Sequence, residues 1–108
     1  MPWRLATVGP WLAETTAGTN VTVNSVLAGP TLTEGVGGFL RGLAEKRGVA
    51  FDVIEREFFE GVRPSSLIRR FEQPEEIAAM VAFLASPRSS GTNGAAVRVE
   101  GGIVRSIL

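Results

Sequence analysis

The 108-residue chain contains no cysteine, no histidine and no tyrosine, and Lys46 is its single lysine. Without cysteine it can form neither a disulfide nor a thiolate metal site, and without histidine the common zinc spacings are excluded as well. We therefore expect no metal. A chain without cysteine also fits a reducing compartment, and a cytoplasmic location is expected.

Charge of one sign and long apolar runs are missing too. Eleven basic and eleven acidic residues give a net charge of zero, and the arginines are scattered. A balanced surface gives no electrostatic reason to bind nucleic acid or a membrane. No apolar run approaches the ~20 residues needed to span a bilayer. The sequence thus predicts neither a nucleic-acid nor a membrane partner.

The length allows one domain at most, with a modest core. Two segments have strand character. Val21–Leu27 is rich in β-branched residues, and its mixture of alternating and continuous apolar positions suits a strand covered on both faces. Ala95–Val99 is the second predicted strand, and Gly101-Gly102 ends it. With helices between them, these strands are expected to pair in parallel.

The segments between the strands have helical patterns. Thr33 can cap a helix that begins at Glu34, although Gly35, Gly37 and Gly38 weaken its start, and a firmer stretch is expected over residues 39–46. Residues 51–59 form a second, short amphipathic helix. A weaker helical pattern over residues 3–16 is interrupted by Gly9-Pro10.

The clearest helix signal is Pro74–Ala85. Proline suits the first helical position, and Glu75-Glu76 meets the positive end of the helix dipole. The apolar spacing i, i+3, i+4, i+7 predicts one core face, made of Ile77, Met80, Val81 and Leu84.

Three runs carry a resemblance to a known family: V-T-V-N-S-V-L-A-G-P-T-L-T-E-G (Val21–Gly35), Q-P-E-E-I-A-A-M-V-A-F-L-A-S-P (Gln73–Pro87) and G-A-A-V-R-V-E-G-G (Gly94–Gly102). They resemble, in order, a late strand with its "P-G" loop, the last large helix and the last strand of short-chain dehydrogenases/reductases. That family consists of NAD(P)-dependent oxidoreductases. The resemblance implies an α/β fold, the C-terminal portion of a Rossmann-like doubly wound parallel sheet, with residues 1–108 as a single partial domain.

The resemblance also implies a cofactor site. In a doubly wound sheet, ligands lie beyond the carboxyl ends of the strands, where Ala28 to Thr33 falls. By position, Gly29 matches the family's loop glycine, Thr31 the residue whose backbone meets the nicotinamide carboxamide, and Thr33 the threonine near the phosphates. Ala28 stands where the family has proline, which loosens the turn. An ordinary loop with a helix cap is the alternative interpretation.

The family's catalytic parts have no counterpart in this chain. Its proton donor is the tyrosine of a Tyr-x-x-x-Lys pair, and its phosphate-binding turn is G-x-x-x-G-x-G; the glycines of residues 35–38 follow a loop and not a first strand. No catalytic residue is assigned. The chain resembles a truncated enzyme whose parent binds NAD or NADP, and we expect it to be inactive alone and to bind no dinucleotide tightly.

Two alternatives follow for function. One is the C-terminal part of a short-chain oxidoreductase, with the substrate-side loop, the lid helices and the last helix and strand. The other is a non-catalytic module that self-associates on the same scaffold. In the family the last helix and strand also form a dimer interface, and a sheet of two strands exposes its edges, so a homodimer or larger homo-oligomer is expected.

Some individual side chains have structural or open roles. Asn24 is expected to tie its strand to a loop rather than to act in catalysis. A set of apolar residues on the two middle helices forms either the core or the wall of a substrate cleft: Phe39, Leu40, Leu43, Val53, Ile54, Phe58 and Phe59.

Overall fold

The computed structural model describes residues 11–106. The chain divides into two compact units, one of residues 11–27 and 77–99 and the other of residues 28–76 and 100–106. Each unit is described by itself below. The prediction of one partial domain over residues 1–108 stays a prediction.

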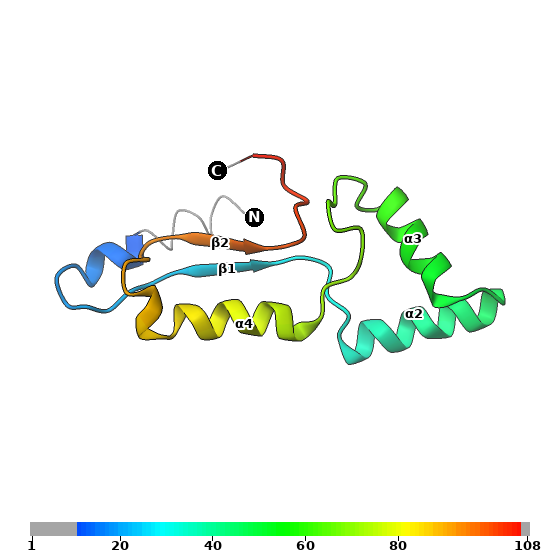
Figure 1. Ribbon diagram of the computed structural model, residues 1–108, viewed down its shortest axis with the longest axis horizontal. Helices are drawn as coiled ribbons and strands as arrows, with labels where there is room; N and C mark the ends of the chain where they lie inside the picture. The colour runs from blue at the N-terminus through cyan, green and yellow to red at the C-terminus, as the bar shows by residue number, and fades with distance from the viewer. Residues whose placement is uncertain (1–10, 107–108) are drawn as a thin grey trace. The chain divides into compact units, whose positions relative to one another are not determined.

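The first unit contains a parallel pair of short strands, β1 (Ser25–Ala28) and β2 (Ala96–Val99). Their arrows point the same way in Figure 1, and α4 (Pro74–Leu84) runs along them in the opposite direction. The predicted α/β class and the parallel pairing are confirmed. Residues 11–15 are helical, whereas Trp3 and the rest of residues 1–10 lie outside the described residues.

Both strands are shorter than predicted, because side-chain amides replace backbone partners at the start of the ladder. The Val23 N–H donates to Asn93 Oδ1 at 2.9 Å, and the Ala95 N–H donates to Asn24 Oδ1 at 3.0 Å. Asn24 Nδ2 in turn donates to the Thr92 carbonyl at 3.1 Å. The structural role predicted for Asn24 is thereby confirmed.

Helix α4 begins at Pro74 as predicted, but its predicted core face is only partly formed. Ile77, Met80 and Leu84 are half-buried, Val81 is 48% exposed, and no residue of the helix is fully buried. The helix is apolar on most of its circumference, so the described chain covers one side and leaves the other open. The assignment of Val81 to a core face was wrong for this reason.

The second unit is built around the helix pair α2 (Glu34–Arg47) and α3 (Phe51–Gly61). Thr33 caps α2, as predicted, by accepting the Val36 N–H at 3.3 Å. Gly48 ends α2 in the left-handed conformation with φ 67°, which glycine adopts without strain. The helix runs unbroken from Glu34, so the glycines in its first turns do not delay its start.

The core of this unit settles most of the open apolar assignments. Leu40, Ile54 and Phe59 are buried together with Ala44 and Phe71. Partly buried residues pack against this cluster: Leu32, Leu43, Val49, Phe51 and Phe58. The rings of Phe58, Phe59 and Phe71 have centroids 4.9 to 5.1 Å apart. Phe39 is different, with 72% of its surface exposed.

Candidate functional site

The candidate site is the loop of residues 29–33, between the end of β1 and the start of α2. All three residues predicted to meet a cofactor lie on it, and backbone hydrogen bonds join the loop to residue 72. The assignment of Gly29, Thr31 and Thr33 to cofactor binding stays a prediction. Their local geometry defines what the loop can offer.

Gly29 lies in a space that admits no side chain. A Cβ atom built there would lie 2.6 Å from Glu100 Cα and 2.7 Å from Glu72 Oε1. A Cβ atom does not approach other heavy atoms so closely, so alanine at this position forces the backbone to move. The glycine is thus explained by packing inside the unit, independently of any ligand.

Thr31 belongs to a short pairing with residue 72. The Glu72 N–H donates to the Pro30 carbonyl at 2.9 Å, and the Leu32 N–H donates to the Glu72 carbonyl at 2.8 Å, which makes a parallel bridge between Thr31 and Glu72. The Thr31 hydroxyl donates to the Gly29 carbonyl at 2.8 Å. These bonds fix the loop on both sides of Thr31.

Thr33 lies exposed at the N-terminus of the fourteen-residue helix α2. Its hydroxyl oxygen accepts the Val36 N–H, while its O–H can still donate. A helix N-terminus presents free N–H groups and the positive end of the dipole, which favours phosphate oxygens. The geometry therefore suits the position near phosphates that the family resemblance implies for Thr33.

Glu72 was missed by the sequence analysis. It is 3% exposed, and its Oε1 atom is buried without a hydrogen-bond partner. Burial, followed by the charges of Glu76 and Glu100, raises the pKa of its carboxyl, while Arg70 and the Gly29 amide act in the lowering direction. The only local signal is an acid next to Phe71 in a connecting segment, which is too weak to predict burial.

Its neighbours Glu76 and Glu100 are differently placed. Glu76 forms a two-bond pair with Arg70 at 2.8 and 2.9 Å and accepts the Gln73 N–H at 2.7 Å; the Arg70 bond and then the amide lower its pKa to about 2. Glu100 accepts the N–H groups of Gly102 and Val104 at 3.1 and 2.8 Å. Both carboxylates therefore already accept hydrogen bonds from neighbouring groups.

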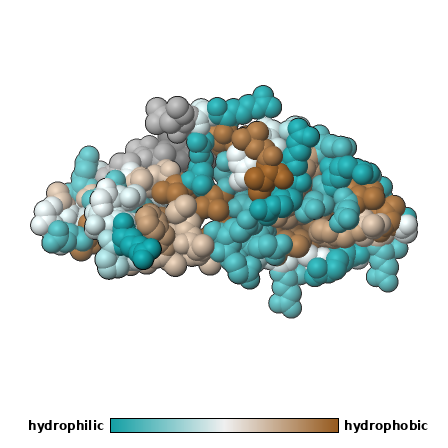
Figure 2. Space-filling model, in the orientation of Figure 1, coloured by the Kyte–Doolittle hydropathy of each residue, from teal (hydrophilic) through white to brown (hydrophobic). Residues whose placement is uncertain are grey.

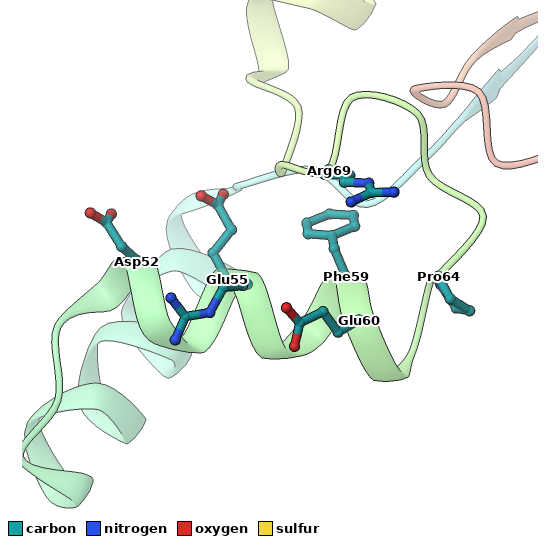
Figure 3. A pocket seen from close by; sticks show the side chains of 7 residues that line it. Asp52, Glu55, Phe59, Glu60, Pro64 and Arg69 are labelled. Carbon is teal, nitrogen blue, oxygen red and sulfur yellow. The ribbon is translucent and has the colours of Figure 1, made fainter.

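Away from this loop, a concavity of about 420 Å³ lies along α3 (Figure 3). Acidic and basic side chains alternate around it, and Glu55 already accepts the Phe71 N–H at 3.0 Å. The described residues include no group of three potential metal ligands, there or elsewhere. We assign it no chemistry. Its lining residues are Asp52, Glu55, Arg56, Phe59, Glu60, Pro64 and Arg69.

Comparison with known proteins decides the family. Residues 5–104 match the sequence model described as enoyl-(acyl carrier protein) reductase. This chain belongs to the short-chain dehydrogenase/reductase family. Within the described residues, no helix is long and apolar enough to cross a membrane.

Individual relatives agree with that assignment. The chain is 51% identical over 96 residues to the uncharacterized oxidoreductase YvrD of Bacillus subtilis, which covers 89% of this chain and 36% of that protein. It is 33% identical over 89 residues to a D-beta-hydroxybutyrate dehydrogenase of Cupriavidus necator, covering 82% of this chain and 33% of the relative. The chain thus spans about a third of the length of these curated relatives.

A solved structure shows the same arrangement. The L-sorbose reductase of Gluconobacter frateurii, in complex with NADPH and L-sorbose, superposes with a TM-score of 0.78 at 26% identity. The match covers 96% of this chain and 38% of that one. The predicted fold, a portion of a Rossmann-like sheet, is confirmed.

Proposed function

We propose that this chain is the C-terminal portion of an NAD(P)-dependent short-chain oxidoreductase, and that the loop of residues 29–33 is its contribution to the cofactor site. The observation that carries the proposal is the loop geometry. Thr31 is fixed by bonds on both sides, and Thr33 caps a helix whose N-terminus suits phosphate oxygens. Relatives that bind NADPH support a dinucleotide as the ligand.

In this proposal the chain's own residues bind the dinucleotide and orient it. The Thr33 hydroxyl and the first N–H groups of α2 hold phosphate oxygens, and the backbone at Thr31 meets the carboxamide of the nicotinamide. The cofactor, when bound, supplies or accepts a hydride. Phe39, exposed on α2 six residues after Thr33, offers an apolar surface for a substrate.

The same proposal holds that the chain does not catalyse alone. It has no tyrosine to serve as proton donor and no G-x-x-x-G-x-G turn to cradle a diphosphate. A helix N-terminus and one hydroxyl supply only part of the contacts that a dinucleotide needs. We further propose a cytoplasmic location, which fits the absence of cysteine and can be checked by cell fractionation.

A hybrid protein tests the assignment of the loop. The chain replaces its matching segment in the Bacillus subtilis oxidoreductase to which it is 51% identical. We expect both that oxidoreductase and the hybrid to bind NADH or NADPH. Thr33→Val should weaken binding by the hybrid about tenfold, the effect of losing one or two hydrogen bonds to a charged group. Thr19→Val, in an exposed turn, is the matched control.

Two results would count against the assignment of this loop to the cofactor site. One is a folded hybrid that fails to bind while the parent oxidoreductase binds. The other is a Thr33→Val hybrid that binds as tightly as the unmodified one.

The alternative function is self-association without catalysis, and one observation favours it. Helix α4 buries none of its residues, with Val81 48% and Phe83 43% exposed, and the two-stranded sheet has both edges unpaired within the described residues. Apolar groups also reach the surface between polar ones on the face in Figure 2. We propose a homodimer or larger homo-oligomer that covers α4. This assembly is compatible with either function.

A further inference from the structure

The least expected group in the second unit is the buried carboxyl of Glu72, which packs against the loop of residues 29–33. Glu72 lies four residues before the ion-paired Glu76 and two before the start of α4. Ionised carboxyl groups are rarely buried without partners, because removing the charge from water costs more free energy than the fold recovers. The Oε1 atom of Glu72 is nevertheless buried and has no hydrogen-bond partner.

Glu72 is joined to the loop through both its backbone and its side chain. Its N–H and carbonyl groups pair with Pro30 and Leu32, and its Oε1 atom lies so close to Gly29 that a Cβ atom built on Gly29 would be 2.7 Å from it. The carboxyl that lies against Gly29 therefore belongs to the same residue that forms one end of the Thr31 pairing. No other acid in this cluster is placed in this way, since Glu76 is paired with Arg70 and Glu100 with two backbone amides.

We infer that Glu72 is a positioning residue for the loop of residues 29–33, and that gain or loss of one proton on its carboxyl sets how firmly that loop is held. In the neutral acid the buried group carries no charge and the loop stays packed on it. On ionisation the proton passes to solvent, and a charge is left behind the loop with no donor on Oε1. Because burial disfavours the charged form more than the Gly29 amide favours it, the carboxyl then moves toward water and releases its contact with Gly29.

The surrounding charges favour the neutral form. Burial, the largest cause, and then the charges of Glu76 and Glu100 disfavour ionisation of the carboxyl, and together they outweigh Arg70 and the Gly29 amide, which favour it, so that the pKa of Glu72 is raised. The folded chain consequently holds the proton to a higher pH than the unfolded chain does. The stabilising contribution is complete below the unfolded value of about 4.3 and is lost as the pH rises through the folded value.

The role of Glu72 in dinucleotide binding rests on the proposed function of the loop. The titration of its carboxyl does not depend on that proposal. The first experiment therefore uses the 108-residue chain without dinucleotide. Amide chemical shifts of Gly29, Thr31 and Leu32 are followed against pH by nuclear magnetic resonance. We expect one shared transition with its midpoint above the ordinary range of glutamate.

Two variants assign that transition. Glu72→Gln keeps the shape of the side chain but cannot ionise, and it should abolish the transition while the chain stays folded. Glu75→Gln removes an equal charge from an exposed position nearby and should leave it unchanged. A transition that persists in Glu72→Gln, or loop amides that do not titrate at all, would overturn the inference.

The second experiment links Glu72 to the cofactor and uses the hybrid oxidoreductase. Affinity for NADPH should fall several-fold as the pH rises through the same midpoint, and Glu72→Gln should remove this dependence. A hybrid that binds NADPH with the same pH profile with and without Glu72→Gln would overturn the cofactor link. A hybrid that binds no dinucleotide would refute the proposed function, while the titration of the isolated chain still decides the role of Glu72.

Discussion

At the scale of single residues, Gly29 is a position where the surrounding backbone leaves no room for a side chain. We expect Gly29→Ala to lower the free energy of unfolding by about 1–3 kcal/mol, because the added Cβ meets the Glu100 backbone and the Glu72 carboxyl at under 3 Å. Urea denaturation measures the change. Gly91→Ala, where the Cβ meets no atom within 4 Å, is the control and should be nearly neutral. Equal effects of the two substitutions would show that the close packing around Gly29 is absent in solution.

Glu76 leads to a pH prediction opposite in sign to that for Glu72. Its pKa is lowered to about 2, first by the Arg70 hydrogen bond and then by the Gln73 amide, so its stabilising contribution is present above the unfolded value and is lost as the pH falls toward 2. Glu76→Gln should therefore destabilise the chain at neutral pH, and the difference from the unmodified chain should disappear in acid. Denaturation over a pH series measures it, with Glu75→Gln as the control. A difference that is independent of pH would exclude the ion pair as its cause.

Residue-scale features were also the hardest to predict from the sequence. The roles of Thr33 as a cap and Asn24 as a tie were predicted, since each acts through local positions or a family motif. The burial of Glu72 was not predicted, because its pairing with residues 30–32 joins segments some forty positions apart in a connector without periodicity. Local patterns contain no information on such a contact.

At the scale of elements, two glycines, one inside helix α2 and one directly after it, should respond to alanine in opposite directions. Gly38 faces open space inside the helix, and alanine there should stabilise the chain by up to about 1 kcal/mol. Gly48 ends the helix with φ 67°, where alanine should cost about 1–2 kcal/mol. Thermal denaturation followed by circular dichroism tests both. Two changes of the same sign would contradict the helix boundary at Arg47.

Element types were predicted better than element faces. The strands, the two middle helices and α4 were all found, since periodicity and caps mark them. The strand ends shifted where asparagine side chains took over backbone partners. Val81 was placed in a core face because the apolar spacing indicates which residues share one side of a helix. Spacing does not indicate whether another part of the described chain covers that side.

At the scale of the whole molecule, the exposed side of α4 predicts association. Covering a few hundred Å² of apolar surface is worth several kcal/mol at about 25 cal/mol per Å², which is comparable with the net stability of a domain. Sedimentation at micromolar concentration should find a dimer or larger species, and Val81→Lys should shift it toward monomer. Val62→Lys, at an exposed residue after α3, is the control and should leave the assembly intact. A cooperative monomer, or an assembly indifferent to Val81→Lys, would refute the α4 interface.

The central claim is that this chain carries part of a dinucleotide site and needs the remainder of a family member to complete it. Titration calorimetry with NADPH and NADH tests this most directly, on the isolated chain and on the hybrid oxidoreductase under the same conditions. The account predicts no heat of binding at micromolar concentration for the isolated chain and saturable binding for the hybrid. Micromolar binding by the isolated chain would contradict it.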